Sequence, residues 1–159
     1  NNAAMGKDGV LATLHDSDIS QLIKVNIEAP ILLTKYMLRS MLINRAGRII
    51  NISSIIASTG FNGLSVYAAT KAALSGFTRS LAREVGKANI TVNTVAPGYM
   101  ETDMTIALQG EKLESIKRRS CLGYLTRLED VAHAVSYLLS EKAASLTGAT
   151  ITVDAGSTA

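Results

Sequence analysis

Residues 16–44 carry apolar side chains at intervals of three and four, which is the spacing of a helix face. Ser17 is in position to cap the first turn. Pro30 has no backbone N–H to donate, so it predicts a kink or a break near residues 27–29. The apolar positions that recur on common faces of this segment are Ile19, Leu22, Ile23, Ile27, Leu33, Tyr36, Met37 and Met41.

Two later segments show helical patterns as well. Residues 66–86 are rich in alanine, with charged side chains to solvate the outer face, and Gly86 is expected to end the helix. Residues 129–139 have the pattern of a shorter amphipathic helix. Each of the three predicted helices precedes a short apolar run.

Those runs, at residues 48–53, 90–95 and 149–153, are rich in β-branched side chains and too short for helices, so they predict buried strands. Strands that alternate with long helices form right-handed crossovers in a parallel sheet. We therefore expect an α/β fold with three parallel strands and flanking helices. The connection over residues 98–127 is longer than this fold needs, which favours a lid or a substrate loop; a structural insertion with one or two short helices is the alternative.

Composition narrows the classes of protein. The chain has 159 residues, of which 47% are hydrophobic, enough for one domain with a sizeable core. The net charge is only +3 and the basic residues are scattered, so we expect no nucleic-acid partner. Residues 49–70 carry no charge, but their Asn, Ser, Thr and Gly residues exclude a membrane span. The first residues lack the features of a signal peptide, and we expect a cytoplasmic protein.

Cysteine and histidine are scarce. Cys121 is the only cysteine, so no intramolecular disulfide can form, which suits a reducing compartment. His15 and His133 are the only histidines, and a Cys/His zinc site would have too few ligands. No metal site is expected.

Tyr67 is followed four residues later by Lys71, the first charged residue after the uncharged run. Side chains at i and i+4 share a helix face, so the ammonium can lie beside the phenol. A cation within about 4–6 Å favours the phenolate and lowers the pKa of the phenol toward the range useful for proton transfer. Alone, the pair is a weak motif, because Tyr-x-x-x-Lys also arises by chance on helix surfaces.

The surrounding sequence strengthens the motif. Ser54 lies at the end of the first predicted strand, where open α/β sheets bind their ligands. Pro97 and Gly98 turn the chain after the next strand, and Thr102 offers a hydroxyl beyond them. Because the carboxyl ends of parallel strands meet at one edge of a sheet, we expect these groups to converge with Tyr67 on one site.

Four stretches, ISS at 52–54, YAATK at 67–71, NNAA at 1–4 and VAPGYMET at 95–102, resemble the short-chain dehydrogenase/reductase family, most closely its 3-oxoacyl-acyl-carrier-protein reductases. The resemblance covers essentially the whole chain. It implies the C-terminal part of a Rossmann-like, doubly wound parallel sheet. One departure is Ala155, which stands where the family more often has glycine.

The resemblance implies a role for each matching residue. Ser54 matches the serine that hydrogen-bonds the substrate carbonyl, and Tyr67 matches the proton donor in reduction. Lys71 matches the lysine that holds the nicotinamide ribose and lowers the tyrosine pKa. Asn26 matches the asparagine that anchors a proton-relay water. The residues expected to contact the cofactor are Asn2, Tyr67, Lys71, Pro97, Gly98, Met100 and Thr102.

The implied activity is NAD(P)H-dependent reduction of a carbonyl to an alcohol, with NADP(H) favoured and NAD(H) possible. The favoured substrate is a 3-oxoacyl thioester of acyl carrier protein or CoA, as in fatty acid biosynthesis. Reductases of sugars, polyols, steroids or small ketones share the same motifs. Enoyl reductases are disfavoured, because that related group spaces its tyrosine and lysine more widely. An alternative of another class is a truncated, non-catalytic product that acts only as an interaction piece.

Partners follow from the same resemblance. A homotetramer is expected. Arg45, assisted by Lys87, is a candidate contact for an acidic acyl carrier protein, although a solvated cation at a helix end is an equal alternative for Arg45.

The sequence contains no Gly-x-x-x-Gly-x-Gly turn of the kind that opens the family's N-terminal βαβ half and holds the cofactor pyrophosphate. We therefore expect residues 1–159 to be the C-terminal catalytic portion of a single domain, preceded by about a hundred residues that include four strands. Such a portion is expected to be inactive alone. It is also expected to be oligomeric or associated with the missing half, because the strand at 48–53 would expose an edge.

Overall fold

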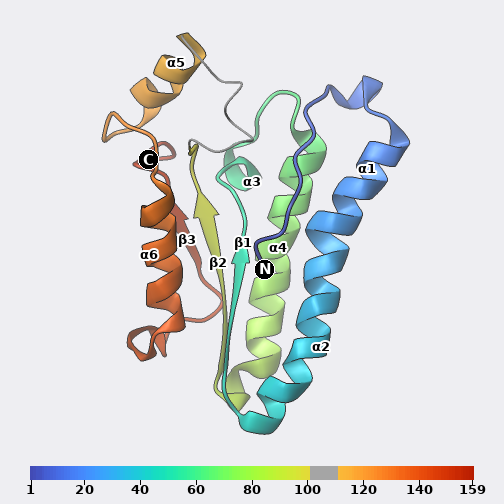
Figure 1. The fold of residues 1–159 in the computed structure, drawn as a ribbon, viewed down its shortest axis with the longest axis vertical. Helices are drawn as coiled ribbons and strands as arrows, with labels where there is room; N and C mark the ends of the chain where they lie inside the picture. Colours follow the sequence, from blue (N-terminus) through green and yellow to red (C-terminus); the bar gives the residue numbers. More distant parts are fainter. Residues whose placement is uncertain (101–110) are drawn as a thin grey trace.

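The computed structural model describes residues 1–100 and 111–159, which form a parallel sheet with helices on both faces (Figure 1). The three strands lie in the order β1 (Gly47–Ile52), β2 (Ile90–Pro97) and β3 (Thr150–Val153), and all point the same way. This confirms the expected α/β architecture of three parallel strands with flanking helices.

The central strand β2 is buried along its whole length, because helices cover both faces of the sheet. On β1 the side chains alternate between the two faces. Ile49 packs with Leu81 of helix α4 (Ser65–Val85). Ile50 packs on the other face with Leu138 of helix α6 (Leu128–Leu139). The sheet therefore separates two hydrophobic clusters.

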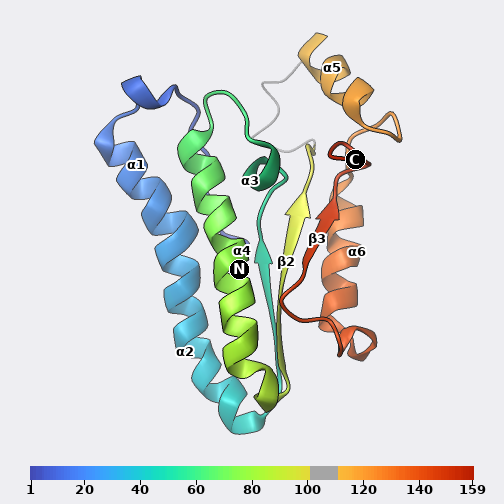
Figure 2. The same cartoon turned by 180° about the vertical axis from the view of Figure 1, so that it is seen from behind.

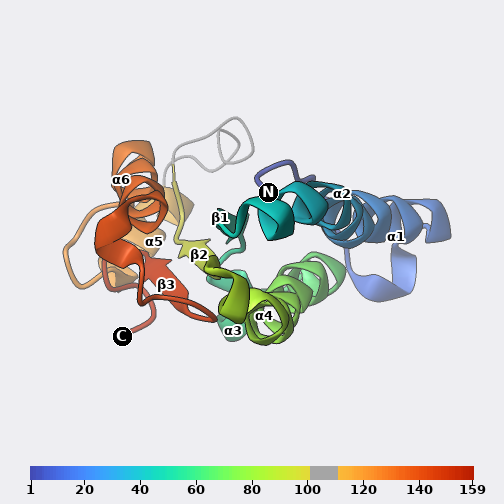
Figure 3. The same cartoon turned by 90° about the horizontal axis from the view of Figure 1, so that it is seen from below.

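The helices that connect successive strands, α4 and α6, lie on opposite faces of the sheet (Figures 1 and 3). Because the strand order advances in one direction, crossovers on opposite faces have opposite hands. With the strands pointing up, α6 lies in front of the sheet and β3 lies to the left of β2, so the second crossover is left-handed. The expectation of right-handed crossovers throughout is wrong here. Both faces of β1 are apolar, and α6 covers the face that α4 leaves open.

The predicted helix over residues 16–44 is continuous and changes its winding instead of breaking. Its parts are α1 (Asp16–Ile23), the π-helical turn η2 (Lys24–Glu28) and α2 (Ala29–Asn44). In the π turn, the N–H of Ala29 donates to the carbonyl of Lys24, five residues back. A wider turn just before Pro30 thus takes the place of the expected kink.

The other predicted elements agree with the structure to within one or two residues. At the start of α1, the N-cap is His15 and not Ser17. The short elements that the sequence pattern did not predict are the turns η1 (Leu11–Thr13), η3 (Gly86–Ala88) and η4 (Glu141–Ala143) and the helix α3 (Ile56–Thr59). Helix α5 (Glu111–Arg119) lies in the long connection over residues 98–127, where one or two short helices were the alternative to a lid or a substrate loop. Seen from behind, α3 lies beside the carboxyl-terminal end of β1 (Figure 2). No helix in the described parts of the chain is long and apolar enough to cross a bilayer.

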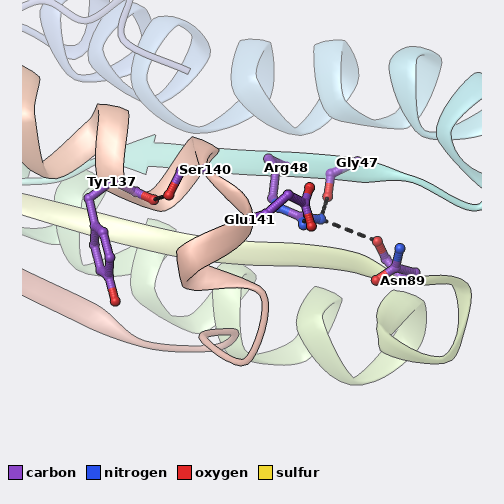
Figure 4. A network of polar contacts seen from close by, with 6 residues as sticks. All are labelled: Gly47, Arg48, Asn89, Tyr137, Ser140 and Glu141. Atoms are coloured by element: carbon purple, nitrogen blue, oxygen red, sulfur yellow. Dashed lines mark hydrogen bonds and ion pairs between the residues drawn. The ribbon is translucent and has the colours of Figure 1, made fainter.

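At the amino end of the sheet, a largely buried arginine links three segments (Figure 4). Arg48 Nη1 donates to the carbonyl of Gly47 at 3.0 Å and to that of Asn89 at 3.4 Å. Arg48 Nη2 forms an ion pair of 3.2 Å with Glu141 of η4. Because only 11% of the Arg48 side chain is exposed, this cation is desolvated, and the partners of Nη1 and Nη2 compensate for part of the lost water, while the buried Nε has no partner among the described residues. The contacts join the starts of β1 and β2 to the segment after α6.

Candidate active site

The carboxyl ends of the three strands are joined by main-chain hydrogen bonds at one edge of the sheet. Just beyond β1, the N–H of Ile55 donates to the carbonyl of Pro97 at 3.0 Å. The N–H of Gly98 donates to the carbonyl of Val153 at 2.8 Å. Ser54 therefore lies directly beside the turn at the end of β2, as expected.

Tyr67 lies in the first turn of α4, and the side chain of Ser54 is close enough to its phenol to lower the phenol's pKa as a hydrogen-bonding neighbour. Ser54 Oγ also accepts the N–H of Ile56 at 3.2 Å, which fixes the position of the hydroxyl oxygen. One turn further along α4, Lys71 Nζ lies 5.8 Å from the centroid of the Tyr67 ring. The structure therefore brings Ser54, Tyr67 and Lys71 together.

Lys71 is buried, and its ammonium donates to the carbonyl of Ile52 at 2.9 Å. None of the ion pairs found among the described residues involves this ammonium. An ammonium has three N–H donors. Two of those of Lys71 therefore have no partner in the described part of the chain.

Burial decides the proton affinities of the pair. Burial raises the pKa of Tyr67 above its ordinary value of 10.0, and the hydrogen bond with Ser54 lowers the pKa by less. Burial lowers the pKa of Lys71 from 10.5 to about 8. The net shift of the Tyr67 pKa is thus upward, opposite to the lowered pKa that was expected, because the loss of water around the phenol outweighs the interaction with Ser54. At neutral pH the phenol is protonated.

Asn26 lies in the π turn, and its side chain is fully engaged. Its Oδ1 accepts the N–H of Met5, and its Nδ2 donates to the carbonyl of Met5, both at 2.9 Å. Nδ2 also donates to the hydroxyl of Thr70 at 3.1 Å. If Asn26 anchors a water, its main-chain carbonyl is the better candidate, since Pro30, four residues later, has no N–H to donate to it.

Besides Tyr67 and Lys71, the residues expected to contact a cofactor lie at the end of β2 and in the first segment of the chain. Pro97 and Gly98 end β2 at the sheet edge described above, followed by the partly buried Met100. Asn2 is exposed. Thr102 lies outside the described residues.

Asn1, which precedes Asn2, lies along the open edge of β1. Its N–H group donates to the carbonyl of Ile50 at 2.9 Å, and its carbonyl accepts the N–H of Ile52 at 3.0 Å. These are the two bonds of a parallel-strand pair centred on Asn51. Asn1 therefore holds the first segment against the sheet and sets where Asn2 lies.

Gly98 is required by close packing between the ends of β2 and β3. A Cβ atom at this position would lie 2.7 Å from Cα of Asp154 and 3.0 Å from Oγ1 of Thr126. We expect Gly98→Ala to lower the free energy of unfolding by about 1–3 kcal/mol, because the Asp154 backbone would have to move. Denaturant unfolding of the intact protein measures this change.

Gly76, in the interior of α4, is the matched control, since a Cβ there meets nothing within 4 Å. Gly76→Ala is expected to raise the free energy of unfolding by about 0.5–1 kcal/mol through the better helix propensity of alanine. Equal effects of the two substitutions would contradict the packing argument. Ala155, which follows Asp154 in the chain, has a φ angle of 53°. This is the left-handed conformation that favours glycine, the residue that the resembling family more often has at this position.

Two residues to which sequence reasoning assigned no role contact the catalytic candidates. Thr70 donates to the main-chain carbonyl of Tyr67, and Ser53 donates to that of Lys71. Thr70 could have been recognised from the sequence because it lies three residues after Tyr67, on the same helix face. Ser53 was recognisable only as a polar residue at the end of an apolar strand.

Arg45 and Lys87, the candidate contacts for a carrier protein, do lie together: Arg45 Nη2 donates to the carbonyl of Lys87 at 2.9 Å. Arg45 immediately precedes β1, whereas Ser54 immediately follows it. The pair is therefore at the amino end of the sheet, on the side opposite Ser54, Tyr67 and Lys71.

Comparisons with known proteins show which proteins the chain is similar to. Residues 1–158 match a family model described as Enoyl-(Acyl carrier protein) reductase. The chain is 43% identical over 155 residues to a 3-oxoacyl-(acyl-carrier-protein) reductase FabG from Rickettsia conorii, with 98% of this chain and 64% of the relative covered. It is 44% identical over 156 residues to the protein of the same name from Pseudomonas aeruginosa, with 98% and 63% covered. The chain thus spans less than two thirds of the length of these relatives.

Among solved structures, the chain is similar to a gluconate 5-dehydrogenase from Burkholderia cenocepacia, determined in complex with NADP and tartrate. The TM-score is 0.96 at 27% sequence identity, and the match covers 99% of this chain and 62% of that protein.

Proposed function

Since the chain belongs to the short-chain dehydrogenase/reductase family, we propose that the intact protein reduces a carbonyl group to an alcohol with a nicotinamide cofactor. The observation that carries this proposal is the grouping of three side chains: Ser54 lies close enough to the phenol of Tyr67 to lower its pKa, and the ammonium of Lys71 lies 5.8 Å from the centroid of the tyrosine ring. A hydroxyl and a protonated phenol side by side can both donate to one carbonyl oxygen. Similarity to reductases over nearly the whole chain supports the same activity.

In this proposal, Ser54 and Tyr67 bind and polarise the substrate oxygen, and Tyr67 gives up its proton as negative charge develops there. The raised pKa of Tyr67 keeps the phenol protonated at neutral pH, which suits a proton donor. Lys71 stabilises the phenolate that remains. Asn26 supports the relay that returns a proton to Tyr67, through a water on its main-chain carbonyl.

The residues present fit the nicotinamide end of a cofactor. The two N–H groups of Lys71 that have no partner in the described residues suit the hydroxyls of a ribose. Asn2, Pro97, Gly98, Met100 and Thr102 are proposed to line the same end. The cofactor would supply hydride to the carbonyl carbon. NADP(H) is favoured over NAD(H), and the similar gluconate 5-dehydrogenase structure, which contains NADP, supports that preference.

The favoured substrate is a 3-oxoacyl thioester of acyl carrier protein or CoA, supported by the names of the relatives. A sugar or polyol dehydrogenase is the second candidate, supported by the similarity to the gluconate enzyme. Reduction of an enoyl thioester, the reaction in the family model's description, is disfavoured by the spacing of Tyr67 and Lys71. A homotetramer is also proposed. Helix α2 carries exposed apolar side chains that support self-association, namely Leu33, Tyr36 and Ile43. Sedimentation of the intact protein measures its oligomeric state.

The test is turnover by the intact protein of acetoacetyl thioesters, crotonyl thioesters and gluconate, each with NADPH and NADH or the oxidised forms. We expect kcat/KM to be largest for the acetoacetyl thioester with NADPH. A larger kcat/KM for gluconate oxidation would show that the protein is a sugar or polyol dehydrogenase. No turnover of any carbonyl or alcohol in this panel would contradict the proposed activity.

A further inference from the structure

Two buried hydroxyl groups hold the main chain of the turn that runs from Tyr67 to Lys71. The hydroxyl of Thr70 donates to the carbonyl of Tyr67 at 2.7 Å, and the hydroxyl of Ser53 donates to the carbonyl of Lys71 at 2.9 Å. Only 1% of Thr70 and 4% of Ser53 is exposed. The turn that presents the phenol and the ammonium is therefore anchored at both ends.

The contact at Thr70 extends beyond its own helix. While its hydroxyl donates to the Tyr67 carbonyl, the same oxygen accepts Nδ2 of Asn26 at 3.1 Å. Asn26 in turn exchanges two hydrogen bonds with the backbone of Met5. A hydroxyl that accepts and donates at once is polarised by both partners, so the chain of bonds is stronger than its separate parts. Thr70 thus connects the π turn and the first segment of the chain to the start of α4.

We propose that Thr70 is a positioning residue for Tyr67: by linking the amide of Asn26 to the Tyr67 carbonyl, it holds the phenol against the Ser54 hydroxyl. This inference rests on the proposed function. Ser54 follows β1 whereas Tyr67 lies in the first turn of α4, so the interaction of their side chains depends on where α4 lies relative to its neighbours. A shift of about 1 Å in a reacting group is enough to reduce turnover strongly.

Thr78 provides a matched comparison within the same helix. It lies eight residues after Thr70, none of its side chain is exposed, and its hydroxyl accepts Nδ2 of Asn51 at 2.8 Å. It also accepts the hydroxyl of Thr94 at 2.8 Å. Removing either threonine hydroxyl leaves an asparagine amide with one acceptor fewer in the core. Removal of the Thr78 hydroxyl also takes the acceptor from the Thr94 hydroxyl, so Thr78→Val disturbs the core at least as much as Thr70→Val. Only Thr70 is bonded to Tyr67.

The experiment compares Thr70→Val, Thr78→Val and Thr70→Ser in the intact protein with its cofactor. We expect Thr70→Val to lower kcat by about tenfold or more with little change in KM, because the phenol is no longer held in its reactive position. Thr78→Val is expected to keep kcat within about twofold of the parent, and Thr70→Ser to restore most of the loss. Thermal unfolding should show a loss of melting temperature in Thr78→Val at least as large as that in Thr70→Val, so a smaller kcat in Thr70→Val cannot come from instability alone.

A second readout does not depend on turnover. Tyrosines labelled with ¹³C at the ring carbon that bears the hydroxyl report the titration of each phenol by NMR, and the Tyr67 signal is identified by its absence in Tyr67→Phe. Because the Ser54 hydrogen bond lowers the pKa of Tyr67, loosening that bond in Thr70→Val is expected to raise this pKa further. The pKa should not change in Thr78→Val.

Equal reductions of kcat in the two valine variants, with an unchanged Tyr67 titration, would overturn the inference and leave Thr70 a structural residue. Should Thr70→Val fail to fold, Thr70→Ala removes the same hydroxyl without placing a methyl group against Asn26, and the comparison is made with Thr78→Ala. The proposed function fails separately, if Tyr67→Phe itself retains the parental turnover.

Discussion

Tyr67→Phe in the intact protein is expected to lower kcat for carbonyl reduction by about 1,000-fold or more. The substitution removes one hydroxyl and keeps the ring, so the packing around α4 is preserved while the proton donor is lost. The hydroxyl of Ser54 loses its partner as well, which weakens the binding of the substrate oxygen. Steady-state kinetics with the acetoacetyl thioester and NADPH measures the effect.

Tyr137→Phe is the control, because Tyr137 lies on α6 with 45% of its surface exposed, and none of the side-chain contacts found among the described residues joins it to the candidate site. Its kcat should stay within about twofold of the parent. If Tyr67→Phe retained more than about a tenth of the parental kcat, general-acid catalysis by Tyr67 would be rejected.

Lys71→Met is expected to lower kcat by about 100-fold or more, since the phenolate formed at Tyr67 loses the charge that stabilises it. Methionine keeps a long side chain in the same space, but the carbonyl of Ile52 loses its donor. Lys35→Met is the control: the ammonium of Lys35 lies 5.9 Å from the ring of Tyr36, almost the same geometry, on exposed positions of α2. Activity close to the parental level in Lys71→Met would contradict the assigned role.

The lowered pKa of Lys71 is expected to make the free energy of unfolding depend on pH. Its pKa is lowered from 10.5 to about 8, so in this range the unfolded chain binds a proton that the folded protein has released. The free energy of unfolding therefore rises with pH between about 8 and 10, by on the order of 2 kcal/mol. Tyr67, whose pKa is raised above 10.0, acts in the opposite sense only at higher pH. Denaturant unfolding at pH 7.5 and pH 9.5 should show this rise in the parent and not in Lys71→Met.

Much of the architecture could be predicted from local sequence patterns. The runs at 48–53, 90–95 and 149–153 all form strands of one parallel sheet, because β-branched segments too short for helices have few alternatives in a compact α/β chain. The proximity of Tyr67 and Lys71 also followed from spacing alone, since residues four apart on a helix are neighbours. Ser54 could be placed beside them because parallel strands end at one edge.

Other features depended on which surfaces meet in three dimensions. Apolar residues on both faces of β1 show that both faces need cover, but they do not say that α6 reaches the second face by a left-handed crossover. Pro30 predicted an irregularity, but not that it would be a π turn from which the Asn26 amide donates to Thr70 of α4. No local pattern encodes these long-range choices.

The pKa of Tyr67 shows most clearly the difference between what local sequence predicts and what the folded structure decides. Residue identity and spacing put a cation beside the phenol, and from these alone a lowered pKa is the natural expectation. The fold also removes water from the phenol, and desolvation depends on every segment packed around the site, so the direction of the shift was decided by tertiary structure. Chemistry that rests on neighbours along one helix was determined by the sequence pattern, whereas chemistry that rests on burial required the assembled fold.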